Sequence, residues 1–285
     1  MGNKEKNMYK LAVLDIDGTL LDSKGCITKK TLQTIRAVEK QGGIVTICTG
    51  RNIRKSLPVV KKSGIQVPFA CIDGTLLFDP IKRTAVHDLP LSREEIHFIL
   101  DAAVNEDAFV EVNNGQIYYK FAKKEPLYQY DIFNKRTFLG RIKSYHGGVR
   151  YVKKFDIMRT IPDPVYQIVI AAEPEITKKI KDTIIKFDNG QLEIRDNLWE
   201  KYLFISRKGA TKSMAMERLC NYFQVPMEKT IAIGDEQNDI DMLEKAGMGI
   251  AMGNASENVK AVADYITLSN DADGVADALQ KFFLR

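Results

Sequence analysis

The sequence predicts an α/β protein with a Rossmann-like, three-layer core, a mainly parallel sheet, and an α+β domain inserted into that core. Three observations predict this class. Short apolar runs alternate with helical patterns at both ends of the chain, which is typical of a parallel sheet with helices on its faces. The middle of the chain changes to aromatic-rich pieces with strand character, mixed with helical patterns. A length of 285 residues also exceeds the usual size of one core, so more than one domain is expected.

The first 83 residues contain three predicted strands and two predicted helices. Each strand is a short apolar run rich in strand-forming residues, and the first helix lies between a capping threonine, Thr28, and Gly42. In chain order, the elements are a strand at 9–16, a helix from 28 to 42, a strand at 44–48, a helix at 54–62 and a strand at 69–72. This alternation predicts parallel strands joined by helices.

The same alternation returns toward the C-terminus. We expect helices at 212–223, 240–245, 257–263 and 275–283, and strands at 230–233, 249–252 and 265–268. The middle of the chain mixes strands, at 115–119 and 165–171, with helices, at 93–104 and 176–188. Residues 1–83 and 207–285 are therefore predicted to form one discontinuous core domain, and residues 84–206 an inserted domain.

Composition and charge argue against several classes of partner. The 42 Lys and Arg residues outnumber the 37 Asp and Glu residues only slightly, an excess too small and too dispersed to predict nucleic-acid binding. No apolar run approaches the roughly 18 residues that span a bilayer, and no protein partner is evident. The cysteines are far apart, which predicts reduced thiols in a cytoplasmic protein. They are Cys26, Cys48, Cys71 and Cys220.

Two carboxylates follow the first predicted strand, in the segment Asp15-Ile16-Asp17-Gly18-Thr19. Ligands of open α/β sheets bind beyond the carboxyl ends of the strands. Residues spaced i and i+2 leave a strand on the same side, so Asp15 and Asp17 are expected to converge on one small volume. Their mutual repulsion requires a cation there. Mg²⁺ prefers carboxylates together with phosphate oxygens, so the segment predicts a Mg²⁺ site.

Three further motifs follow strands or begin helices. Gly234-Asp235-Glu236-Gln237-Asn238-Asp239 follows the strand at 230–233 and supplies a further carboxylate, Asp235. Thr49-Gly50-Arg51 follows the strand at 44–48 and offers a hydroxyl group and backbone N–H groups that can hold a phosphate. Lys212 lies in the first turn of a predicted helix, where the helix dipole disfavours a cation. This misfit favours a functional lysine over a solvated one.

In this order and on these elements, the four motifs resemble those of the haloacid dehalogenase superfamily of phosphatases. They look most like its Cof-type branch, in which a cap of the C2 type is inserted between the segments that hold Thr49 and Lys212. The resemblance spans nearly the whole chain. It implies Mg²⁺-dependent hydrolysis of a small phosphorylated metabolite, such as a sugar phosphate or a phosphorylated cofactor, through an aspartyl-phosphate intermediate.

The resemblance also implies a role for each matched residue. Asp15 would be the nucleophile, and Asp17 the general acid and then the general base. The metal ligands would be Asp15, the backbone carbonyl of Asp17, and Asp235, while Asp239 would support the metal ligands or orient Lys212. The phosphate oxygens would be held by the N–H groups of Ile16 and Gly50 and by the side chains of Thr49, Lys212 and Asn238. Two positions depart from the family pattern: Ser213 replaces a usual glycine, and Asp73 a usual asparagine.

Two alternative functions stay open. A phosphomutase shares the aspartyl chemistry but returns the phosphoryl group to its substrate, so it gives no net release of phosphate. A non-catalytic phospho-acceptor or regulatory module would keep the core without turnover. Asp17 argues against such a module, because an acceptor needs no acid–base group two residues after its nucleophile.

Two other stretches have open roles. Residues 72–77 repeat residues 16–21, but Cys71 stands where Asp15 stands in the first copy. We therefore expect a turn leading toward the inserted domain in place of a second nucleophile, with Asp73 either near the substrate or satisfied locally as a turn residue. From residue 120 to 159, eleven basic residues face three acidic ones, which predicts either a surface that attracts anionic substrates or a solvated face. Arg51 is either a surface charge or part of the site.

Overall fold

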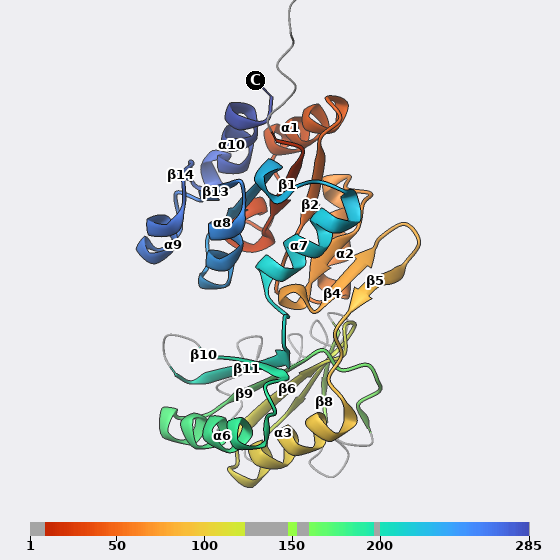
Figure 1. Ribbon diagram of the computed structural model, residues 1–285, viewed down its shortest axis with the longest axis vertical. Helices are drawn as coiled ribbons and strands as arrows, with labels where there is room; N and C mark the ends of the chain where they lie inside the picture. Colours follow the sequence, from red (N-terminus) through yellow and green to blue (C-terminus); the bar gives the residue numbers. More distant parts are fainter. Residues whose placement is uncertain (1–8, 123–147, 153–159, 197–199, 285) are drawn as a thin grey trace, which may run out of the picture. The chain divides into compact units, whose positions relative to one another are not determined.

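The computed structural model describes residues 9–122, 148–152, 160–196 and 200–284 (Figure 1). Contacts within the chain divide it into two compact units. The first unit holds residues 1–51, 56–87 and 211–285, and the second holds residues 52–55 and 88–210. Each unit is built around a large sheet of its own.

A five-stranded parallel sheet forms the centre of the first unit. Its strands are, in spatial order, β14 (Tyr265–Ile266), β13 (Met248–Ala251), β12 (Thr230–Gly234), β1 (Leu11–Leu14) and β2 (Ile44–Ile47). Nearly all residues of the three central strands are buried, as expected of a parallel sheet that is covered on both faces. Strand β1, which precedes Asp15, therefore lies between β12, which precedes Asp235, and β2, which precedes Thr49.

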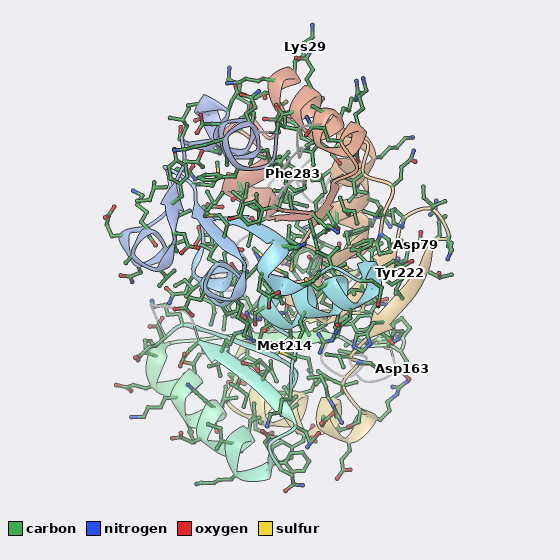
Figure 2. The ribbon with its side chains drawn as sticks, turned by 45° about the horizontal axis from the view of Figure 1, so that its top comes forward. Lys29, Asp79, Asp163, Met214, Tyr222 and Phe283 are labelled. Carbon is green, nitrogen blue, oxygen red and sulfur yellow. The ribbon has the colours of Figure 1, made fainter. Side chains whose placement is uncertain are left out.

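Helices cover both faces of this sheet. Leu11 and Val13 of β1 share a buried cluster with Leu219 and Leu243, so α7 (Lys212–Phe223) and α8 (Ile240–Lys245) pack on that face together with α9 (Glu257–Val262). The alternate residues of β1 point to the other face, where α1 (Lys29–Lys40) and α10 (Gly274–Phe282) pack against each other. Phe283, directly after α10, is buried (Figure 2). The predicted three-layer core is confirmed.

The predicted strand at 69–72 is present but belongs to another sheet. β3 (Phe69–Cys71) pairs antiparallel with β4 (Leu76–Asp79), and β5 (Thr84–Asp88) adds a third strand. A single bridge between Cys48 and Ala70 joins this small sheet to the end of β2. That bridge is parallel, so β3 runs in the expected direction relative to β2. The sequence did not predict that the chain reverses directly after β3 into the antiparallel strand β4. Strands β4 and β5 were not predicted. The helix predicted at 54–62 is α2 (Ile53–Ser63), and it precedes β3.

Within its described residues, the second unit consists of a six-stranded mixed sheet packed against helices. Its strands are, in spatial order, β10 (Leu192–Asp196), β11 (Tyr202–Arg207), β9 (Gln167–Ala171), β6 (Phe109–Asn113), β7 (Tyr118–Phe121) and β8 (Val149–Tyr151). Buried residues of α3 (Arg93–Asn105) and α6 (Pro174–Phe187), such as Ile99 and Ile180, share one cluster with Val110 and Ile168 of the sheet. The predicted α+β character of the inserted stretch is confirmed.

The strand predicted at 115–119 starts later than expected. Asn114 and Gly115 form a turn, in which Asn114 Oδ1 accepts a hydrogen bond from the N–H of Ile117 at 2.9 Å. Side chains of Asn bond readily to nearby backbone groups in turns, so β7 begins only at Tyr118. The strand was predicted to start at residue 115 because the turn at Asn114 and Gly115 was not recognised in the sequence.

Most of the basic stretch at 120–159 lies outside the described residues, so its role stays a prediction. Lys120 is described, and it is fully buried. Its ammonium group pairs with Glu111 at 2.7 Å across two neighbouring strands. Lys120 therefore neither belongs to a solvated face nor offers a free charge to an anion.

The four cysteines are free, as predicted. Within the described part of the chain, no helix combines the length and the apolar character needed to cross a membrane.

Candidate active site

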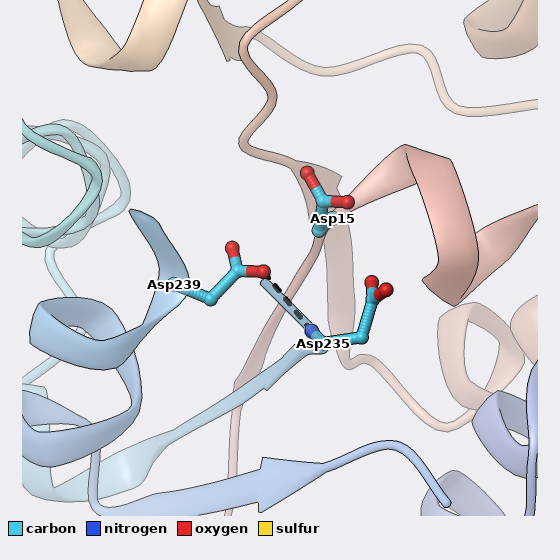
Figure 3. A group of neighbouring side chains, drawn as sticks. All are labelled: Asp15, Asp235 and Asp239. Carbon is cyan, nitrogen blue, oxygen red and sulfur yellow. Dashed lines mark hydrogen bonds between the residues drawn. The ribbon is translucent and has the colours of Figure 1, made fainter. Parts of the chain in front are cut away.

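Neighbouring parallel strands bring two of the predicted site residues to one edge of the first unit's sheet. Asp15 directly follows β1, and its N–H donates to the carbonyl of Ile233 in β12 at 3.0 Å. Asp235 directly follows β12, whose Ile233 is in register with Leu14. The two aspartates therefore leave adjacent strands at the same level, and Figure 3 shows their carboxylates beside that of Asp239.

Three carboxylates and one ammonium group make up the centre of the site. Asp15, Asp235 and Asp239 each have an oxygen atom within 4.8 Å of the others, and all three residues are buried. Lys212 is buried as well. Its Nζ donates to Asp15 Oδ1 at 2.7 Å and to Asp239 Oδ1 at 2.6 Å. One positive charge thus faces three carboxylates away from water.

Burial shapes the titration of these groups. It raises the pKa of Asp15, and it raises the pKa of Asp235 to about 6, because the charged forms lose their hydration. The neighbouring charge of Asp239 contributes to both increases. Burial alone would lower the pKa of Lys212, but Asp15 and Asp239 hold it well above its ordinary value. Lys212 is therefore a lasting cation within the site.

Asp239 fixes both Lys212 and the loop that carries Asp235. While Oδ1 accepts from Lys212, Oδ2 accepts from the backbone N–H groups of Asp235 and Glu236, both at 3.0 Å. The bond to Asp235 is the dashed line in Figure 3. Both oxygens of Asp239 are thus engaged, which favours an orienting role over that of a metal ligand.

Asp235 is held from its other side by the segment that follows Asp15. Thr19 Oγ1 donates to Asp235 Oδ1 at 2.6 Å. Gly18 has a φ of +73°, and a Cβ atom there would lie 2.1 Å from Asp235 Oδ2, so only glycine fits. Asn254 Nδ2 donates to the carbonyl of Gly18 at 2.9 Å. Sequence reasoning assigned no role to Thr19 or Asn254; Thr19 lies inside the first motif, whereas no local pattern marks Asn254.

The acidic cluster fits a divalent cation. All of its donors are oxygen atoms, which hard cations such as Mg²⁺ prefer. Its three buried carboxylates exceed the single charge of Lys212. Burial first, and then the neighbouring charge of Asp239, raise the pKa values of Asp15 and Asp235. A bound cation would remove the excess of negative charge.

The side chain of Asp17 is placed differently from that of Asp15. Its carboxylate is 62% exposed. Arg51 binds it through two nitrogen atoms, with Nε donating to Oδ2 at 2.7 Å and Nη2 donating to Oδ1. The expectation that both carboxylates converge is wrong, because the strand ends at Leu14 and Asp17 lies in a turn. The i, i+2 rule holds only within a strand.

The predicted phosphate-binding residues other than Lys212 follow three strands of the same sheet, β1, β2 and β12. Ile16 and Thr49 are buried, and Thr49 Oγ1 accepts from the N–H of Arg51 at 3.2 Å. Asn238 Nδ2 donates to Asp73 Oδ1 at 2.8 Å. A Cβ atom on Gly50 would lie 3.1 Å from that same oxygen and 3.8 Å from Asn238 Nδ2. Asp73 thus lies among residues predicted to hold phosphate, a position that sequence reasoning left open.

The second copy of the first motif is a turn, as expected. Residues 72–74 connect β3 to β4. Cys71, in the position of the first copy's aspartate, is buried, and its thiol donates to the carbonyl of Leu76 at 3.6 Å. Burial raises the pKa of this thiol, so the reactive thiolate is disfavoured.

Comparison with known proteins identifies the family. The family model for haloacid dehalogenase-like hydrolases matches residues 12–279. Phosphatase YwpJ of Bacillus subtilis is 27% identical, covering 95% of this chain and 99% of its own. The 5-amino-6-(5-phospho-D-ribitylamino)uracil phosphatase YitU of the same species is 28% identical, covering 96% and 97%. A crystal structure of a haloacid dehalogenase-like hydrolase from Bacteroides thetaiotaomicron has a TM-score of 0.79 at 26% identity, covering 96% and 100%.

The chain belongs to the haloacid dehalogenase-like hydrolase family. The resemblance drawn from the four motifs is thereby confirmed, as is the prediction of an enzyme of the phosphoric monoester hydrolase class.

Asp235→Asn is expected to stabilise the metal-free protein at neutral pH. The pKa of Asp235 is about 6 in the folded state, above the ordinary 3.8. The folded state therefore binds the carboxyl proton of Asp235 more tightly than the unfolded state does. The resulting contribution to the free energy of unfolding is complete at low pH and is lost as the pH rises through 6. Because the amide has no charge to bury, the variant should gain on the order of 1 kcal/mol at pH 7. Thermal unfolding in a chelator at pH 4 and pH 7 measures the difference.

Mg²⁺ should reverse the order of stability, so that the wild type becomes more stable than Asp235→Asn. A cation that binds the folded state raises its stability, and the amide is a poorer ligand than the carboxylate. The melting temperature of the wild type should therefore rise with Mg²⁺ at pH 7, and that of Asp235→Asn should rise much less. Equal increases in both proteins would contradict the assignment of Asp235 as a ligand.

Proposed function

We propose that this protein is a Mg²⁺-dependent phosphatase that hydrolyses small phosphate monoesters through an aspartyl-phosphate on Asp15. One observation carries the proposal. Asp15 is buried at the carboxyl edge of the sheet, with Lys212 Nζ at 2.7 Å and Asp235 within the same cluster. The lysine offsets negative charge that would otherwise repel a phosphate dianion from the nucleophile.

The chemistry uses two aspartates in two displacements. In the first, an oxygen of Asp15 attacks phosphorus, the bond to the leaving oxygen breaks, and Asp17 gives its proton to the departing alcohol. In the second, Asp17 takes a proton from water, and the water oxygen attacks the same phosphorus. The bond between phosphorus and Asp15 breaks, which releases inorganic phosphate and restores the carboxylate.

The remaining predicted residues supply binding. Asp15, Asp235 and the backbone carbonyl of Asp17 would hold Mg²⁺, which offsets charge on the transferring phosphoryl group when bound. The phosphate oxygens would accept hydrogen bonds from several donors: Ile16 N–H, Gly50 N–H, Thr49, Lys212 and Asn238. Asp239 positions Lys212 for this task, since it binds the same ammonium group at 2.6 Å.

Residues 84–206 are proposed as the domain that selects the substrate. The core motifs determine which bond is cleaved, but nothing in them specifies the molecule that carries the phosphate. The substrate class proposed is the small phosphorylated metabolite, with sugar phosphates and phosphorylated cofactors as its first members. 5-Amino-6-(5-phospho-D-ribitylamino)uracil is a reasonable probe, since the name of YitU contains it.

The test is a screen for phosphate release over these compounds, with Mg²⁺ and with a chelator. We expect stoichiometric release of inorganic phosphate from at least one compound, and its loss in the chelator. An isomerised phosphate ester without net release would indicate a phosphomutase. A stable phosphoprotein without turnover would indicate a phospho-acceptor module.

A further inference from the structure

A fourth carboxylate lies among the groups proposed to hold the phosphate. Asp73 is only 7% exposed. Its Oδ1 accepts the amide N–H of Asn238 at 2.8 Å, and the same oxygen lies 3.1 Å from where a Cβ of Gly50 would be. Its charge also acts on Lys212. Asp73 therefore binds one of the proposed phosphate donors, Asn238, lies beside a second, Gly50, and acts electrostatically on a third, Lys212.

The backbone holds Asp73 in this place. Its N–H donates to the carbonyl of Thr49 at 3.1 Å, and the N–H of Ile72 donates to the carbonyl of Arg51 at 2.9 Å. Residues 72, 73 and 74 all have positive φ, +53°, +51° and +91°. A β-branched residue such as Ile72 rarely adopts that conformation, and such strain persists only where surrounding contacts enforce it. The turn is thus locked against residues 49–51.

A carboxylate at this position opposes the binding of phosphate in two ways. Its charge repels an anion across a few ångströms of poorly solvated space, where electrostatic effects are large. It also accepts one of the two amide hydrogens of Asn238 and holds that side chain in place, so that at most one hydrogen stays available to a phosphate oxygen. Both effects weaken the complex with any ligand that places a phosphate group there.

We propose that Asp73 is an affinity-determining residue, which weakens phosphate binding and thereby favours the release of inorganic phosphate after turnover. The inference rests on the proposed function, because it takes Asn238, Gly50 and Lys212 to hold the phosphate group.

Asp73→Asn isolates the effect of the charge. Asparagine keeps an oxygen that can accept from Asn238, and it tolerates positive φ better than most residues. We expect the variant to bind inorganic phosphate about tenfold more tightly, as one charge removed from a buried site implies. The measurement is calorimetric titration with inorganic phosphate in the presence of Mg²⁺. The matched control is Asp79→Asn, which neutralises another buried carboxylate, at the end of β4.

Each outcome decides the inference. Tighter phosphate binding by Asp73→Asn, with Asp79→Asn like the wild type, supports it. Equal or weaker binding by Asp73→Asn overturns it and leaves the proposed function standing. Absence of phosphate binding by the wild type and the variant overturns both. If Asp73→Asn does not fold, Asp73→Gly, which also suits the backbone, is held to the same criterion.

Discussion

Asp15→Asn is expected to abolish turnover while leaving the fold intact. An amide has no anionic oxygen with which to attack phosphorus, and it binds a cation less strongly than a carboxylate. We expect kcat to fall at least about 10⁴-fold, in the range found when a nucleophile is removed. Stability should not fall, because burial raises the pKa of Asp15 and so disfavours its charged form in the folded protein.

Two measurements on the same sample test this expectation. One is kcat from phosphate release with the best substrate of the screen, and the other is the melting temperature. Asp101→Asn is the matched control, since it neutralises an exposed aspartate on α3. Turnover by Asp15→Asn within tenfold of the wild type would remove Asp15 from its role as nucleophile. If Asp15→Asn loses activity because it unfolds, the same two measurements are made on Asp15→Ser.

The parts of the fold that local sequence determines were predictable. The helix predicted at 212–223 is α7 to the residue, because Thr211 accepts from the N–H of Met214 and so marks its start. The strand before Asp235 was equally clear from its run of apolar residues. Since parallel strands end at one edge of the sheet, the proximity of Asp15 and Asp235 followed from the order of the elements.

The rest depends on contacts between distant residues. The partner of Asp17 could not be read from the sequence, because Arg51 reaches it only once β1 and β2 lie side by side. The turn at 72–74 was expected, but its backbone conformation was not, since nothing in its sequence predicts a positive φ at an isoleucine. That turn places Asp73 against Asn238. Repeated sequence therefore did not mean repeated structure.

Asp17→Asn is expected to slow turnover by about 10² to 10⁴, the usual contribution of general acid–base catalysis. An amide can neither protonate the leaving alcohol nor take a proton from water. Stability should barely change, because the ion pair with Arg51 is partly exposed, and such pairs contribute at most about 1 kcal/mol. The variant and wild type should therefore melt together while their kcat values differ.

The leaving group should decide which step of Asp17→Asn is slow. The phenolate of a phenol that has a low pKa can leave without being protonated. An aryl phosphate of such a phenol should therefore still phosphorylate Asp15 quickly in the variant. The second displacement then lacks its base, and the phosphoenzyme accumulates. Rapid-quench kinetics should show a burst of phenol of about one equivalent per enzyme before slow turnover, the signature of an accumulating covalent intermediate. An alkyl phosphate, which needs the acid, should show no burst. Equal, burst-free slowing of both substrates would make Asp17 a positioning residue, because only a proton donor separates the two leaving groups.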